Sequence, residues 1–294
     1  MSSQTNHGQP IILFSEECEH PASSGENQVS VLHVHLALGD LLLIADGSAG
    51  SEESAVAARL AVEYSYAQLA ALPPDYPAES AIHAAFEYAN AGFLDAAAQD
   101  STLQGIRASL VMALLQQEGD IINAWIGHVG DSRAYLLRAG RLHPLTKDHT
   151  VVQEMLDRDM LSPFEALHHP EAKVVTRSVG MRLGMEIEID QLPLAVGDSL
   201  LLCSGSLWRR IAEQEIQAAA DSATPDSATR NLLALALSSG TPSDIGIELA
   251  RIVLPPETRR PQQHSPFAFV VVLSIFVLAF AGVAALIWYV WSLM

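Results

Sequence analysis

The chain has 294 residues and a formal net charge of −18, from 16 Lys and Arg against 34 Asp and Glu. This length allows one large domain with a hydrophobic core, together with terminal segments. The acidic balance excludes nucleic-acid binding, which requires a basic face. Cys18 and Cys203 are the two cysteines. They show neither a metal-ligand spacing nor a nucleophile pattern, so we expect a reducing compartment.

The pattern of apolar residues predicts alternating groups of strands and helices. Short apolar runs between turn residues indicate strands, and Ala-rich stretches with a 3.6-residue period indicate helices. In chain order we expect strands 29–36 and 40–45, helices 53–72 and 77–98, strands 108–116, 121–129, 133–137 and 141–145, helix 151–159, a helix capped by Ser162, strand 199–203, helix 229–237 and strand 247–253. Tight turns between strands predict antiparallel sheets. The expected fold class is α+β, a sandwich of sheets flanked by helices.

Two segments flank the expected domain, one on each side. Residues 1–24 form an N-terminal segment, and its first ten residues are polar and uncharged, without the basic start and apolar stretch of a secretory signal peptide, so none is expected. Residues 255–266 contain four prolines and predict a linker, because proline disrupts both helices and sheet ladders. The folded domain is therefore expected over residues 25–254.

A membrane-spanning helix is expected at residues 267–291. This stretch carries no charged side chain and is long enough to cross a bilayer as a helix. Aromatic residues gather at its far end, where their rings favour the membrane interface. Arg259 and Arg260 precede the span, and no charged residue follows it. Because basic residues stay on the inner side, we expect a single-pass membrane protein with a cytoplasmic domain.

Five short segments carry the most specific signal. They are Ala45-Asp46-Gly47, Gly130-Asp131-Ser132-Arg133, Leu145-Thr146-Lys147-Asp148-His149, Thr176-Arg177-Ser178-Val179-Gly180 and Gly197-Asp198-Ser199. A single Asp-Gly pair after a strand is only a common turn. In this order and spacing, however, the segments resemble the PPM family of metal-dependent Ser/Thr protein phosphatases, also called phosphatase-2C-like, in its bacterial branch. The resemblance implies a PPM-type antiparallel β-sandwich with a helix pair on each side.

The resemblance also implies a metal site. Family enzymes hold two Mn²⁺ or Mg²⁺ ions that activate a water molecule for hydrolysis of phosphoserine or phosphothreonine. Such hard cations prefer oxygen ligands. The residual metal positions in this chain are Asp46, the carbonyl of Gly47, Asp131 and Asp244.

Four positions depart from the family pattern. The first family motif aligns with Ser24 at its phosphate-binding arginine and with Val29 at its metal-linked aspartate. In the later Ser-Asp-Gly-Leu-x-Asp motif, Gly205 and Arg209 replace the two aspartates. The missing carboxylates predict weak or incomplete metal binding, and the missing arginine removes a bidentate phosphate contact.

These departures leave three functional hypotheses open. The main one is a membrane-anchored pseudophosphatase that binds a phosphorylated protein or a Ser/Thr kinase in signalling, with the family's phosphatase activity lost or weak. The alternative is an active metal-dependent Ser/Thr phosphatase with a modified site. A third is a scaffold of a membrane assembly without phosphate recognition.

Other residues invite weaker interpretations. His149, His168 and His169 resemble a metal cluster, but the first belongs to the family's Asp-His pair and the others end a helix, where histidine interacts well with the dipole. We therefore interpret all three as structural. Trp208 either forms a small binding patch with the arginines that follow it or covers the gap left by the missing aspartate.

Overall fold

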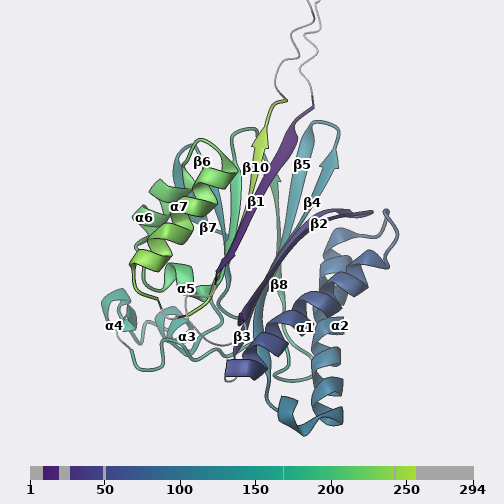
Figure 1. Ribbon diagram of the computed structural model, residues 1–294, viewed down its shortest axis with the longest axis vertical. Helices are drawn as coiled ribbons and strands as arrows, with labels where there is room; N and C mark the ends of the chain where they lie inside the picture. The colour runs from purple at the N-terminus through teal and green to yellow at the C-terminus, as the bar shows by residue number, and fades with distance from the viewer. Residues whose placement is uncertain (1–8, 20–26, 49–50, 168, 242, 256–294) are drawn as a thin grey trace, which may run out of the picture. The chain divides into compact units, whose positions relative to one another are not determined.

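Two five-stranded antiparallel sheets form the centre of the computed structural model (Figure 1). The structure describes residues 9–19, 27–48, 51–167, 169–241 and 243–255. The first sheet has the order β1 (Ile11–Glu19), β10 (Ile245–Val253), β9 (Ser199–Cys203), β6 (Arg133–Arg138) and β7 (Arg141–Pro144). The second has the order β2 (Val29–Leu36), β3 (Gly39–Ser48), β4 (Arg107–Glu118), β5 (Ile121–Val129) and β8 (Glu188–Leu194).

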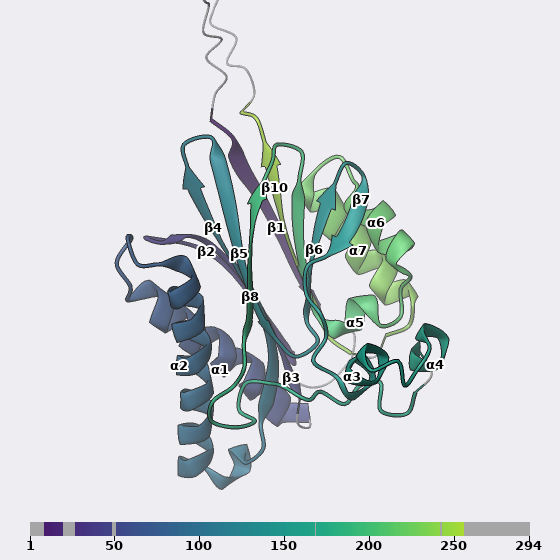
Figure 2. The ribbon, with the colours of Figure 1, turned by 180° about the vertical axis from the view of Figure 1, so that it is seen from behind.

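Helices cover the outer face of each sheet. The helices α1 (Ser51–Ala70) and α2 (Ala78–Gln99) pack on the second sheet, while α6 (Glu213–Ala220) and α7 (Pro225–Ser238) pack on the first (Figure 1). Three shorter helices, α3 (Val151–Asp157), α4 (Pro163–Leu167) and α5 (Gly205–Trp208), lie near one end of the sandwich, and Figure 2 shows them from behind. A 3₁₀ turn, η1 (Ser101–Leu103), follows α2. The predicted α+β sandwich with a helix pair on each side is confirmed.

The central strands are buried on both faces, which explains their continuous apolar runs. In β3, Leu41 and Leu43 contact the cluster under α1 and α2, whereas Leu42 and Ile44 face the interior between the sheets. Successive side chains of a strand alternate between faces. Asp46, two residues beyond Ile44, therefore continues the inward-facing row at the end of β3.

The same alternation brings a second carboxylate to this end. In β10, the buried residues Ala250 and Ile252 belong to the cluster between the sheets. Asp244 lies on the same alternating row, one position before β10 begins. The inward-facing rows of β3 and β10 thus end on aspartates in two different sheets.

The structure also contains elements that the apolar pattern did not predict. β1 pairs with β10 along its whole length, from Ile11 opposite Val253 to Glu19 opposite Ile245. The folded domain thus extends to residue 11, which corrects the expected boundary at residue 25. β8 and α6 were likewise not predicted. β1 and β8 are edge strands, and edge strands carry charged residues that blur the apolar alternation.

The predicted membrane segment falls outside the described residues. None of the helices in the described ranges has both the length and the apolar character needed to cross a bilayer. Residues 256–291, which include nearly all of the predicted linker and the whole predicted span, are not among these ranges. Ser24 and His168 also lie outside them.

Candidate functional site

Asp46 lies at the centre of a group of acidic side chains. It pairs with Val29 of β2 and with Ser109 of β4 in the sheet ladder. Desolvation, with smaller contributions from the neighbouring carboxylates of Asp131 and Asp244, raises the pKa of the Asp46 carboxyl to about 7 against the opposing effect of Arg209. The structure thus brings together the three aspartates that the sequence suggested as metal ligands.

Asp131 is held rigidly beside Asp46. It is buried just after β5, and its carboxylate Oδ1 accepts a hydrogen bond from Ser109 Oγ at 3.0 Å. Ser109 Oγ in turn accepts a hydrogen bond from the Asp131 N–H at 3.3 Å. The Asp131 carbonyl oxygen accepts a hydrogen bond from the indole N–H of Trp208 at 2.9 Å. These contacts fix one carboxylate oxygen and leave the other for a cationic partner.

Asp244 and Gly47 are positioned by the segment that precedes β2. The Asp244 carboxylate accepts a hydrogen bond from the backbone N–H of Gln28, whose carbonyl oxygen accepts one from the Gly47 N–H at 2.8 Å. Position 47 requires glycine, because a Cβ there would lie 1.9 Å from the carbonyl oxygen of Ser54 at the start of α1. The close approach of α1 therefore sets the geometry of this end of β3.

Arg209 supplies the cation of the cluster. A Cβ at Gly205 would lie 2.5 Å from Cζ of Arg209 and within 2.7 Å of both terminal nitrogens. The guanidinium thus occupies the place where a side chain at position 205 would begin. Its Nη2 donates a hydrogen bond to Oδ2 of Asp131, and desolvation of the guanidinium is opposed by the charges of Asp131 and Asp46. The glycine at position 205 leaves this space free, and the side chain of Arg209 fills it.

The side chains of this cluster do not offer the oxygen ligands that a centre of two divalent ions needs. Such ions need several carboxylate or carbonyl oxygens each. Here a guanidinium with a permanent charge lies against Asp131, and Val29 places an apolar side chain directly opposite Asp46 in the ladder. Arg209 compensates part of the negative charge that a metal would otherwise neutralise.

Trp208 is part of a second network beside the cluster. The Arg133 guanidinium stacks 3.4 Å from the centre of the Trp208 ring system, and it binds both carboxylate oxygens of Asp148 at 2.7 and 2.8 Å. Of the two roles considered for Trp208, covering the gap at position 205 is excluded, because Arg209 fills that gap. The sequence offered no signal for this stacking, since the residues are 75 positions apart (208 − 133).

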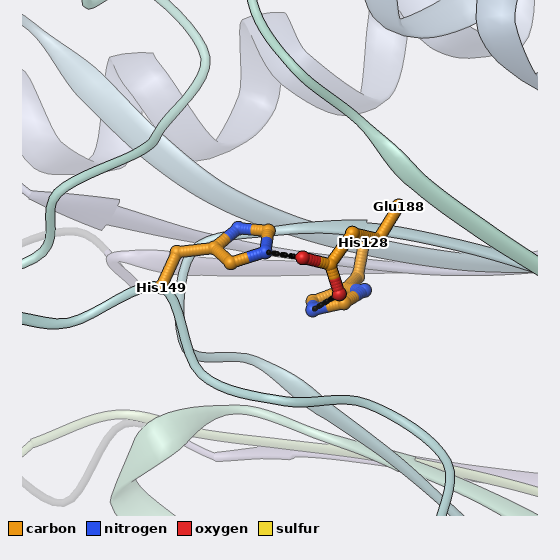
Figure 3. A group of neighbouring side chains, drawn as sticks. All are labelled: His128, His149 and Glu188. Carbon is orange, nitrogen blue, oxygen red and sulfur yellow. Dashed lines mark ion pairs between the residues drawn. The ribbon is translucent and has the colours of Figure 1, made fainter. Parts of the chain in front are cut away.

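A histidine pair nearby resembles a metal site but is satisfied without one (Figure 3). His149 Nε2 lies 3.0 Å from a carboxylate oxygen of Glu188, and its Nδ1 accepts a hydrogen bond from the Gly130 N–H at 3.2 Å. Desolvation, followed by the nearby ring of His128, lowers the pKa of His149 to about 4. The neutral ring therefore carries its proton on Nε2 and donates it to Glu188.

Two further contacts argue against a cation between these three side chains. His128 Nε2 lies 2.8 Å from the carbonyl oxygen of Lys147, within hydrogen-bond distance. The Arg177 guanidinium lies 3.2 Å from Glu188 and 3.3 Å from His149. A divalent ion here would face this fixed positive charge. The structural interpretation of His149 is thus supported, and the sequence had not suggested its partner Glu188.

Comparison with known proteins identifies the family. Residues 19–205 match the family model described as Protein phosphatase 2C. The chain belongs to the protein phosphatase 2C family. Within this family, the serine/threonine phosphatase stp of Listeria monocytogenes is 29% identical over 180 residues, which cover 60% of this chain and 70% of that protein. The serine/threonine protein phosphatase PstP of Mycobacterium tuberculosis is 31% identical over 218 residues, 72% of this chain but only 40% of PstP.

A solved structure of the family agrees with the fold. The catalytic domain of PstP in complex with two manganese ions superimposes with a TM-score of 0.72 at 26% identity, covering 83% of this chain and all of that domain. The PstP domain therefore binds the kind of ion that the sequence motifs implied for the family. In the present chain the corresponding protein phosphatase 2C motifs converge on Asp46, Asp131 and Asp244, but together with Arg209.

Proposed function

We propose that this chain is a membrane-anchored pseudophosphatase, a protein phosphatase 2C fold that binds a phosphorylated protein or a Ser/Thr kinase and hydrolyses phosphoproteins weakly or not at all. The position of the Arg209 guanidinium carries this proposal. It contacts Asp131 and fills the space of a side chain at position 205. A divalent ion placed there would have fewer oxygen ligands than it needs and would be repelled by the guanidinium.

The residues of this chain suit binding better than hydrolysis. The carboxylates of Asp46, Asp131 and Asp244 are held in place by hydrogen bonds, ladder pairing and one internal cation. No described group of this cluster is positioned to activate a water molecule as a metal would. The retained fold of the phosphatase family is the basis for the proposed phosphoprotein or kinase binding.

A hydrolysis assay tests this proposal. The purified chain should cleave a phosphothreonine peptide in the presence of Mn²⁺ at least about 100-fold more slowly than the Listeria phosphatase stp, because loss of a group that stabilises developing charge costs a factor of this order. Calorimetry should detect no tight binding of two Mn²⁺ ions. Rapid turnover that depends on Mn²⁺ would overturn the proposal.

The competing candidate is an active metal-dependent Ser/Thr phosphatase with a rebuilt site. The names of the relatives favour it, since stp and PstP are both called phosphatases. The retained carboxylates of Asp46, Asp131 and Asp244 also favour it. The hydrolysis assay and the calorimetry together distinguish the pseudophosphatase from the active phosphatase, because an active enzyme must bind metal before it hydrolyses the peptide.

The membrane anchor is a separate part of the proposal. It is supported by the uncharged stretch 267–291 and by Arg259 and Arg260 before it. In sealed spheroplasts, external protease should leave the folded domain intact until detergent is added. Inverted vesicles should instead release the domain after cleavage in the stretch 255–266. Digestion of the domain from outside intact spheroplasts would overturn this orientation.

A further inference from the structure

β1 lies at the edge of the first sheet, beside β10 (Figure 1). It pairs with β10 along its whole length, from Ile11 to Glu19, and the register contains no bulge. Among the described residues, no strand is hydrogen-bonded to the other side of β1. A regular edge strand of this length presents a row of N–H and C=O groups with which an extended segment can pair.

The register decides which backbone groups of β1 face outwards. The Ser204 N–H donates a hydrogen bond to the Gly246 carbonyl oxygen at 3.0 Å, so the even-numbered residues of β10 are bonded to β9. In an antiparallel sheet the intervening residues are bonded to the strand on the opposite side. The odd-numbered residues of β10 are therefore bonded to β1, where odd-numbered residues lie opposite them. It follows that the N–H and C=O groups of Ile12, Phe14 and Glu16 point away from β10.

The other edge strands carry features that hinder further pairing, whereas β1 does not. β7 ends on Pro144 and β8 contains Pro193, and proline cannot donate to a ladder. At the start of β2, the Val29 carbonyl oxygen accepts a hydrogen bond from Sγ of Cys18 at 3.6 Å. This contact also closes one end of β1, so the accessible part of the edge is residues 11–16. β1 itself contains neither proline nor lysine, and two of its apolar side chains are more than a third exposed.

The side chains of this edge indicate the chemistry of its partner. Ile12 and Phe14 pack on the core between the sheets but remain partly exposed, and Glu16 is exposed beside them. A second copy of this chain would fit poorly. An antiparallel pair of two β1 strands centred on Phe14 would place Glu16 of each copy opposite Ile12 of the other, and both copies carry a net charge of −18. A segment with basic residues beside the glutamates and apolar residues beside Ile12 and Phe14 matches the edge.

We propose that the free edge of β1 binds an extended segment of another protein, basic at its start and apolar after it, by antiparallel strand addition. Its lysine or arginine side chains would lie opposite Glu16 and Glu17, and its apolar side chains would cover Ile12 and Phe14. Pairs of opposite charge and apolar pairs both stabilise a ladder. The antiparallel direction continues the pattern of the whole sheet. The inference goes beyond the proposed function, because binding at β1 requires neither phosphate recognition nor hydrolysis.

Fluorescence anisotropy of a labelled peptide with blocked ends, Lys-Lys-Thr-Val-Thr-Ile-Thr, tests this site on the full-length protein. Antiparallel pairing places its valine opposite Phe14 and its second lysine opposite Glu16. The peptide should bind, and a version with glutamate at both lysine positions should bind at least about 10-fold more weakly. N-methylation of the valine and the isoleucine removes the two N–H groups that face β1, and it should lower the affinity at least about 10-fold. N-methylation of the first two threonines is the matched control, because their N–H groups face away from β1, and it should leave the affinity within about twofold.

Two substitutions in the protein test the same edge. Ile12→Pro removes an outward N–H of β1 and keeps the ladder with β10, so it should weaken peptide binding at least about fivefold in a folded protein. Glu16→Lys should weaken binding about 10-fold, because it replaces attraction across the ladder by repulsion. Glu79→Lys on the exposed side of α2 makes the same change in net charge away from β1, and it should leave the affinity within about twofold.

Three results would overturn the proposal. They are no binding of the lysine peptide, equal affinity for the two N-methylated peptides, and unchanged binding in both Ile12→Pro and Glu16→Lys with circular dichroism showing folded variants. A dimer in analytical ultracentrifugation that Ile12→Pro converts to a monomer would assign the edge to a second copy instead, and would also overturn it. The pseudophosphatase proposal stands or falls separately, because the hydrolysis assay and the Mn²⁺ calorimetry do not involve β1.

Discussion

Replacing Arg209 with methionine should lower the free energy of unfolding by about 3–5 kcal/mol, the usual cost of removing one partner of a buried ion pair. Asp131 is almost fully buried, and Arg209 is the cation that contacts its carboxylate. Methionine keeps much of the side-chain volume but removes the charge, so the carboxylates of Asp131 and Asp46 would lose their internal counter-ion. Denaturant unfolding followed by circular dichroism measures the change.

Two controls sharpen this experiment. Arg59→Met breaks an ion pair with Glu63 in which both side chains are more than half exposed, and it should cost less than about 1 kcal/mol. Millimolar Mn²⁺ should raise the melting temperature of Arg209→Met more than that of the wild type, because an ion that binds only the folded state stabilises it. If Arg209→Met is as stable as the wild type and insensitive to Mn²⁺, the guanidinium is not the counter-ion of this cluster.

The combined variant Gly205→Asp with Arg209→Asp should raise the affinity for Mn²⁺ by about 100-fold over the wild type. It removes the internal cation and adds oxygen ligands beside Asp46 and Asp131. Gly205→Asp alone should gain much less, because the Arg209 guanidinium lies against the new side chain and would form an ion pair with it. Addition of Val29→Asp should increase the affinity further, since Val29 is paired with Asp46 in the ladder.

Calorimetry measures the Mn²⁺ affinity of each variant, and a phosphothreonine peptide assay measures its hydrolysis rate. Gln191→Glu adds a carboxylate on the exposed side of β8 and is the control for charge alone, so its Mn²⁺ affinity should equal that of the wild type. Equal affinity in the wild type and in the combined variant would mean that the guanidinium does not govern metal binding. A gain from Gly205→Asp alone as large as that of the combined variant would lead to the same conclusion.

Local sequence signals predicted most of the sandwich, and tertiary contacts explain the exceptions. The strand predicted at 29–36 has the bounds of β2, and the expected cap at Ser162 is present, because Ser162 Oγ accepts a hydrogen bond from the Glu165 N–H at 3.3 Å. β1 was not predicted. Its side chains are exposed or partly buried and include several glutamates, so its pairing with β10, together with the packing of Ile12 and Phe14 on the core, defines it as a strand.

The sequence by itself determined which carboxylates converge and which are missing. The resemblance of the segments around Asp46 and Asp244 to the family motifs predicted that these carboxylates converge, and in the structure both end inward-facing rows of apolar strands. The sequence also showed that glycine and arginine stand at positions 205 and 209. Only the tertiary structure decided where the arginine goes. A long side chain has many rotamers, and it was the empty volume at Gly205, together with the buried carboxylate of Asp131, that selected the one placing the guanidinium among the aspartates.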